Sequence, residues 1–157
     1  MFEKTFSNII FALLLQDFPE SLVAVLFVFS ILNLRLRDKK VLYVALLQTI
    51  IGLVRLLPVA FGIHSVILII TLALYTRLFT KVQLSKVFMA VLICFAVVAL
   101  AEITYTKPFL SLTGLSYETA FASPLLRAVF ALLYEIIILA LSLGKNYYNH
   151  KKGLIIN

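Results

Sequence analysis

The chain has 157 residues, of which 63% are hydrophobic and only 13% are charged. Soluble domains are typically about 45–50% apolar and about 25% charged, so this chain has too little polar surface to cover a soluble globule. Its mean hydropathy of +1.10 argues against a soluble enzyme, a disordered tail and a nucleic-acid-binding domain. The composition therefore predicts an all-α integral membrane protein in contact with the lipid bilayer.

Apolar runs separated by short polar turns predict a polytopic transmembrane helix bundle with one domain. A helix needs about 20 residues to cross the hydrocarbon core. Runs close to that length lie at 41–61, 63–79, 86–105 and 124–143, and a shorter one extends over 18–36. We therefore expect five spans, an extracytoplasmic loop at 107–123 and a tail at 144–157. Residues 1–17 fit an interfacial helix, a re-entrant segment or a thin sixth span.

Helix-terminal residues support these boundaries. Asp17 is placed as an N-cap, with Pro19 in the first helical turn. Ser123 is placed as the N-cap of the last helix, and Gly144 stands where a C-terminal cap is expected.

The net charge of +7 is organised along the chain. Ten of the 14 Lys and Arg residues lie in 35–40, 77–86 and the tail, which are alternate connections of a five-span bundle. Cytoplasmic loops carry an excess of basic residues, so the charge predicts a multi-pass protein of the cell membrane with a cytoplasmic C-terminus. We interpret the basic charge as a topology signal and expect no nucleic-acid partner.

Four charged residues lie inside predicted spans, where each costs several kcal/mol unless it is paired or hydrated. Arg55, Glu102 and Arg127 share the outer third of the membrane by helical rise. They predict an ion-paired cluster open to the outside. Two interpretations stay open: structural pairing between helices, or a binding site for an anionic or carboxylate-bearing ligand.

The fourth charge, Glu135, lies near the midplane. We expect it to face protein or a polar cavity rather than lipid, as a neutral carboxyl hydrogen-bonded to Gln48, Tyr75 or a water. Its role is either an interhelical hydrogen bond or a site for a ligand cation or a basic residue of a partner.

Polar and small residues at helical spacing form three stripes, one of which joins Arg127, Ala131, Tyr134 and Glu135 on the last helix. Gln48 shares a helix face with Gly52, and His64 shares one with Thr71 and Tyr75. Small and polar residues at such spacing usually mark helix–helix interfaces. We interpret these stripes first as packing and second as the wall of a ligand cavity.

Catalytic patterns are nearly absent. The two histidines, His64 and His150, are predicted on opposite sides of the membrane, so they cannot form a His-rich metal site. Glu102 and Glu135 differ in depth by about 10 Å on the helical rise, too far to share a proton. We therefore predict no enzyme activity, no cofactor and no metal.

One resemblance gives a functional direction. Residues 58–64 (PVAFGIH), Glu102 before a short loop, and residues 112–127 (LTGLSYETAFASPLLR) resemble the membrane region of Firmicutes sensor histidine kinases. The resemblance is to the accessory-gene-regulator type, covers about residues 40–143 and rests on hydropathy and short motifs. The chain lacks the phospho-acceptor region and Gly-rich nucleotide box of these kinases. The resemblance therefore implies a sensor-like bacterial module, stand-alone or truncated, that acts through a partner.

These observations leave two main functions. The first is a non-catalytic receptor that binds a small ligand or peptide from the outer side and acts by helix contacts on a membrane-protein partner or a second copy. The alternative is a small accessory or structural subunit of a larger membrane complex. A transporter component is disfavoured because the sequence lacks repeated halves.

Overall fold

The computed structural model describes residues 13–56, 62–114, 116 and 124–156. Within these residues the chain is helical and contains no β-strand, apart from an isolated bridge between Leu34 and Ile156. Two short helices, η1 and η2, flank the first pair of α-helices. In chain order the elements are η1 (Leu13–Asp17), α2 (Phe18–Ile31), α3 (Lys39–Gly52), η2 (Leu53–Leu56), α4 (Ile63–Thr80), α5 (Leu84–Thr113) and α7 (Pro124–Lys151).

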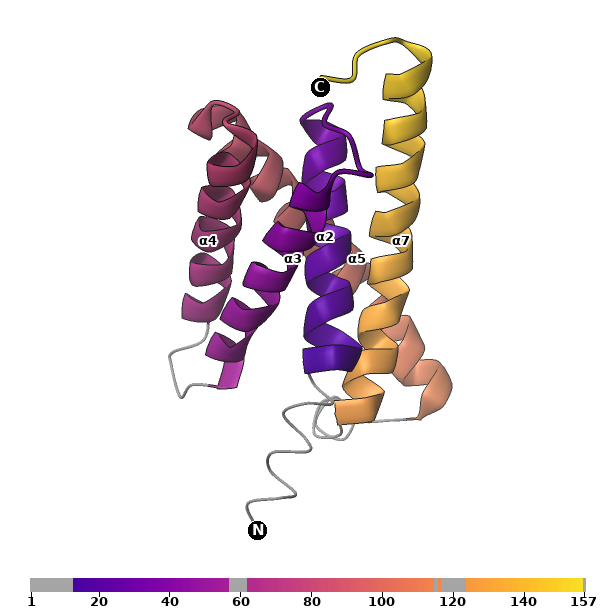
Figure 1. Cartoon of the computed structure of the whole chain (residues 1–157). Helices are drawn as coiled ribbons and strands as arrows, with labels where there is room; N and C mark the ends of the chain where they lie inside the picture. The colour runs from indigo at the N-terminus through magenta and orange to yellow at the C-terminus, as the bar shows by residue number, and fades with distance from the viewer. Residues whose placement is uncertain (1–12, 57–61, 115, 117–123, 157) are drawn as a thin grey trace.

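The α-helices alternate in direction along the chain (Figure 1). The α2–α3 turn, the α4–α5 turn and the C-terminus consequently lie at one end, which we call the basic end. It carries the three basic segments 35–40, 77–86 and 145–152, which therefore lie at one end of the bundle. The start of α2, the end of α3 and the start of α4 lie at the opposite end.

Helix α2 is the centre of the bundle. It packs against α3, α5 and α7, whereas α4 lies at the periphery against α3 and α5 (Figure 1). Val25 and Val28 of α2 are fully buried, and Phe29 is 1% exposed. A helix that is apolar on all faces is stable where neighbours surround it, which explains why this short segment occupies the interior.

In the part of the chain that the structure describes, three helices are long and apolar enough to cross a membrane. These are α4, α5 and the part of α7 from Ala128 to Lys151. Helices α2 and α3 have 14 residues each, which corresponds to about 21 Å and is shorter than a hydrocarbon core of about 30 Å. The finding supports a helical membrane bundle, and length and composition together identify three candidate spans.

Two helices end at C-terminal capping hydrogen bonds, and these positions differ from the ends predicted from hydropathy. Helix α2 ends at Ile31, before the predicted limit of 36, because Asn33 adopts a left-handed conformation (φ 59°) and the Leu34 amide donates to the Phe29 carbonyl (2.9 Å). Helix α7 passes the predicted end at Gly144 and continues to Lys151. Gly153 (φ 64°) then ends α7 in the same way.

The predicted loop at 107–123 is helical in its first part. Helix α5 continues through Pro108 to Thr113 and ends at Gly114, which is left-handed (φ 66°). A proline removes one helical hydrogen bond, and the remaining bonds of α5 carry the helix past it.

The predicted N-caps have different outcomes. Asp17 has helical backbone angles and makes no capping hydrogen bond, because η1 runs directly into α2; Pro19 does lie in the first turn of α2. The predicted N-cap Ser123 lies outside the described residues, as does most of the 1–17 segment.

Candidate functional site: a polar cavity among four helices

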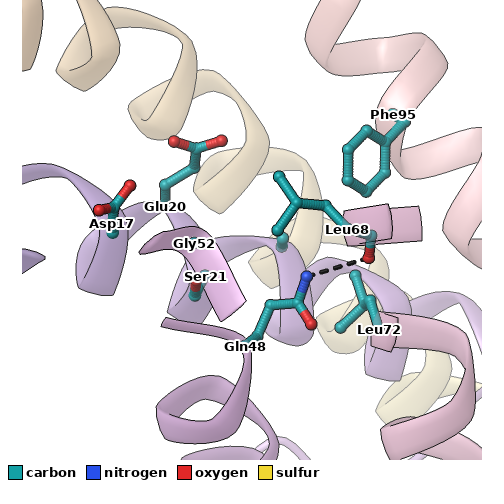
Figure 2. Close-up of a pocket in the computed structure, with 9 residues that line it drawn as sticks. Asp17, Glu20, Ser21, Gln48, Gly52, Leu68, Leu72 and Phe95 are labelled. Carbon is teal, nitrogen blue, oxygen red and sulfur yellow. Dashed lines mark hydrogen bonds between the residues drawn. The ribbon is translucent and has the colours of Figure 1, made fainter. Parts of the chain in front are cut away.

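A small cavity lies between α2, α3, α4 and α5, at the end of the bundle opposite the basic end (Figures 1 and 2). Its volume is about 30 Å³, which accommodates about two water molecules. Four of its lining residues are polar, but most of the surface that the cavity exposes is apolar. The lining residues are Asp17, Glu20, Ser21, Ala24, Gln48, Gly52, Leu68, Leu72 and Phe95.

Helical spacing explains why these residues meet. Residues three and four apart share a helix face, so Asp17, Glu20 and Ser21 project from one side where η1 joins α2. The same i, i+4 relation joins Gln48 to Gly52 on α3, and Leu68 to Leu72 on α4. The cavity is thus formed by one face from each of several helices.

Gln48 holds α3 and α4 together at the cavity wall. Its side chain is 4% exposed, and its Nε2 donates to the Leu68 carbonyl (3.0 Å), as Figure 2 shows. Its Oε1 accepts from Thr71 Oγ1 (3.2 Å). Both ends of the Gln48 amide therefore bond to α4. Gln48 thus has the packing role that was the first interpretation of its stripe, and it also lines the cavity.

Gly52 makes room for the Asp17 carboxylate. A Cβ at position 52 would lie 3.3 Å from Asp17 Cγ, closer than an ordinary van der Waals contact. Asp17 is 9% exposed and Glu20 is half-buried, and both have interaction partners. The end of α3 therefore approaches the Asp17 side chain closely because residue 52 lacks a side chain.

The apolar wall is continuous with the core. Leu72 is fully buried and Leu68 is 5% exposed. Beside Phe95, the fully buried Cys94 places its Sγ 3.9 Å from the Ala24 carbonyl of α2. The cavity thus joins carboxylate, hydroxyl and amide groups to an apolar surface.

The residues of a second predicted stripe lie along α4. His64 is half-buried in the first turn of this helix, and Tyr75 is half-buried against the core cluster. Between them, Leu68 lines the cavity and Thr71 binds Gln48. The α4 stripe therefore contacts α3 in its middle, and neither His64 nor Tyr75 lines the cavity.

Glu135 is buried in the protein interior, as expected, with 4% exposure. The expected hydrogen bonds from Gln48 or Tyr75 are absent, since Glu135 Oε1 finds no hydrogen-bond partner in the described part of the chain. The reason is topological: α2 separates α7 from α3, and α4 lies beyond α3 (Figure 1). Its electrostatic neighbour is instead Glu20 of α2.

The expected pairing of Glu102 with an arginine stays a prediction. Glu102 is half-buried on α5 and has an interaction partner. Arg55 lies in η2 and Arg127 in the first turn of α7, while the positions of their side chains are outside the described part of the structure.

Asp17, Glu20 and Ser21 are the site residues that the sequence reasoning missed. They were interpreted as helix-start residues or not considered. A usable signal was their i, i+3, i+4 spacing, which places three polar groups on one face of a segment that is otherwise apolar.

Among the described residues, no group of three or more His, Cys, Asp or Glu side chains is arranged to hold a metal ion. No protein-family model, no curated protein and no solved structure matches the chain.

Proposed function

We propose that the chain crosses the membrane five times, with its basic end in the cytoplasm. Helices α2 and α3 are short by themselves, but η1 and η2 extend them. The continuous helical segments 13–31 and 39–56 reach about 27–29 Å, close to a hydrocarbon core of about 30 Å. The alternating helix directions and the basic residues at one end support this orientation.

Within that topology, we propose a non-catalytic receptor-like module whose ligand site is the polar cavity at the outer end. The observation that carries this proposal is the convergence of four helices on one mostly apolar cavity whose lining includes Asp17, Glu20, Ser21 and Gln48. The resemblance in hydropathy and short motifs to bacterial sensor regions agrees with it.

Helix α2 provides the route from the site to the cytoplasmic side. Its first turn supplies Glu20 and Ser21 to the cavity. Its last turn supplies the Ser30 carbonyl, which accepts a hydrogen bond from Asn149 Nδ2 of α7 (2.7 Å). A ligand that shifts the start of α2 therefore acts on a rigid element whose other end contacts the C-terminal helix at the basic end. A partner or a second copy would receive the signal there.

The cavity lining indicates the chemistry of the ligand. Two carboxylates, a hydroxyl and an amide favour a group that donates hydrogen bonds, such as an amine, and the apolar wall favours a short alkyl chain. The volume admits one such group, so a peptide would insert only one terminal amine or side chain. This differs from the expected anionic ligand, which depended on Arg55 and Arg127.

Thermal unfolding of the purified full-length protein in neutral detergent tests this proposal. We expect methylammonium at millimolar concentration to raise the Tm by a few degrees, and acetate to have no such effect. Glu20→Gln should remove the response. Asp38→Asn is the matched control at the basic end, and it should retain the response. Equal shifts with both ions, or an unchanged response in Glu20→Gln, would contradict the cavity as an amine site.

The single cysteine provides a second readout. Cys94 is fully buried beside the cavity wall, so its alkylation by a membrane-permeant maleimide requires helix opening. Methylammonium should slow this alkylation in the unsubstituted protein and have no effect in Glu20→Gln, because any ligand of the folded state reduces opening and only the substitution locates the site.

The accessory-subunit alternative predicts a different result from native membranes. Purification in mild detergent should then yield a large partner in fixed stoichiometry, identified by mass spectrometry, and methylammonium should change neither readout.

A further inference from the structure

A second and larger hollow lies at the basic end, where the α2–α3 turn meets the C-terminal part of the chain. Its volume is about 780 Å³, within the range of about 300–1,000 Å³ usual for small-molecule sites. It shares no lining residue with the outer cavity. The lining residues are Arg35, Leu36, Arg37, Asp38, Lys39, Asn146, His150 and Ile155.

The walls of this basic pocket are held in place by the fold. Asn149, 1% exposed, donates from Nδ2 to the Ser30 carbonyl and fixes α7 against the end of α2. The Ile156 amide donates to the Asn33 carbonyl (2.8 Å) and brings the C-terminal tail back over the turn (Figure 1). The pocket is therefore formed by two ordered segments rather than by isolated surface side chains.

The charge of the pocket is strongly positive. Three cations, Arg35, Arg37 and Lys39, face a single carboxylate, Asp38. The Asp38 carboxylate already interacts with Lys40: it accepts a hydrogen bond from the Lys40 amide (3.0 Å) and forms an ion pair with Lys40 Nζ (3.5 Å). Asn146 and His150, four residues apart on α7, add an amide and an imidazole that can donate hydrogen bonds. Two guanidinium groups with these added donors suit an oxyanion with several oxygens, above all a phosphate.

The pocket also lies at the depth of lipid headgroups. Asn146 and His150 follow Pro124 by 22 and 26 residues, or about 33–39 Å along α7. With Pro124 at the outer edge of the hydrocarbon, a core of about 30 Å ends just before Asn146, and the inner headgroup layer, about 5–8 Å thick, extends to about 35–38 Å. The phosphate layer of the inner leaflet therefore coincides with the pocket.

We propose that the basic pocket binds a phosphate group, supplied by an anionic phospholipid of the inner leaflet. Arg35 and Arg37 bind the phosphate oxygens, and Leu36 and Ile155 contact the apolar part of the headgroup region. A soluble phosphate ester has the same chemistry, so the test compares the two sources.

Binding is measured with the full-length protein, delipidated in neutral detergent, by titration with short-chain phosphatidylglycerol, short-chain phosphatidylcholine and glycerol 3-phosphate. We expect saturable phosphatidylglycerol binding at least tenfold tighter than that of the other two. Each basic residue near a charged membrane surface changes affinity by about fivefold, so R35Q/R37Q should weaken binding by about 25-fold.

The matched control is K81Q/K86Q, which removes the same charge from the same end outside the pocket and should change affinity by less than threefold. If R35Q/R37Q fails to fold, Asn146→Asp provides the same test, because it adds a carboxylate to the pocket and keeps every cation. Tight binding of glycerol 3-phosphate, lost in the same variants, would support the phosphate site but assign a soluble source. Equal losses in both double variants, or no saturable binding of any probe, would overturn the proposal.

Discussion

Replacing Gln48 with leucine tests the hydrogen bonds that join α3 to α4. The buried amide makes two such bonds, to the Leu68 carbonyl and to Thr71 Oγ1. Leucine has a similar volume and leaves no buried donor at position 48. The Gln48→Leu variant should therefore lose these bonds with little change in packing.

The expected loss in the free energy of unfolding is small. Hydrogen bonds between membrane helices contribute about 0.6 kcal/mol on average, with a maximum near 1.7 kcal/mol, so two bonds correspond to about 1 kcal/mol and at most about 3 kcal/mol. The single hydroxyl proton of Thr71 also lies within reach of the Ile67 carbonyl (2.8 Å) and donates there once the Gln48 amide is removed, so the substitution does not leave the hydroxyl unsatisfied. The low end of the range is therefore expected.

Reversible unfolding by sodium dodecyl sulfate in mixed micelles measures this loss. Gln83→Leu is the matched control, because Gln83 is exposed and makes no capping bond at the start of α5. A double-mutant cycle of Gln48→Leu with Thr71→Val should give a coupling energy of about 0.6 kcal/mol. Equal effects of Gln48→Leu and Gln83→Leu together with zero coupling would refute this account of the α3–α4 contact.

Three further predictions concern topology, pairing and the junction at the basic end. In a cysteine-free background, a cysteine at Lys81 should resist a membrane-impermeant thiol reagent in intact cells and one at Ser111 should react; the reverse result would overturn the orientation. Glu102→Gln should lower the Tm, and neutralising Arg127 as well should recover part of the loss if the two residues pair; purely additive losses would reject that pair. Asn149→Ala should reduce the free energy of unfolding by about 1–3 kcal/mol in the same micelle assay, because it removes a buried interhelical bond and leaves a cavity; a loss below about 0.5 kcal/mol would contradict this role.

The sequence by itself determined the membrane class, the helical architecture and the grouping of the basic segments. Composition decides whether a chain can cover itself with polar surface, and the charge of a connection depends only on its own residues. The positions of the apolar helices were predictable because the hydropathy of a segment also depends only on its own residues. The burial of Glu135 was also predictable, since an unsatisfied carboxyl in contact with lipid is expensive.

Helix ends were predicted less well because they depend on individual backbone conformations. Asn33 and Gly153 end their helices in left-handed conformations, whereas Gly144 and Pro108 lie inside helices. Nothing in local composition distinguishes these two pairs. The hydrogen bonds of the following residues, and the packing that supports each helix, decide between them.

Only the tertiary structure decided which polar residues share a site. Gln48 was predicted to reach Glu135, but central helix α2 separates α3 from α7, and Gln48 therefore binds α4. The same central position brings Glu20 into the outer cavity and the carbonyl of Ser30 to α7 at the basic end. The depth of a residue along a helix follows from counting residues. The helix that a given face contacts depends on the order of the helices in space, and the sequence of one segment does not contain that information.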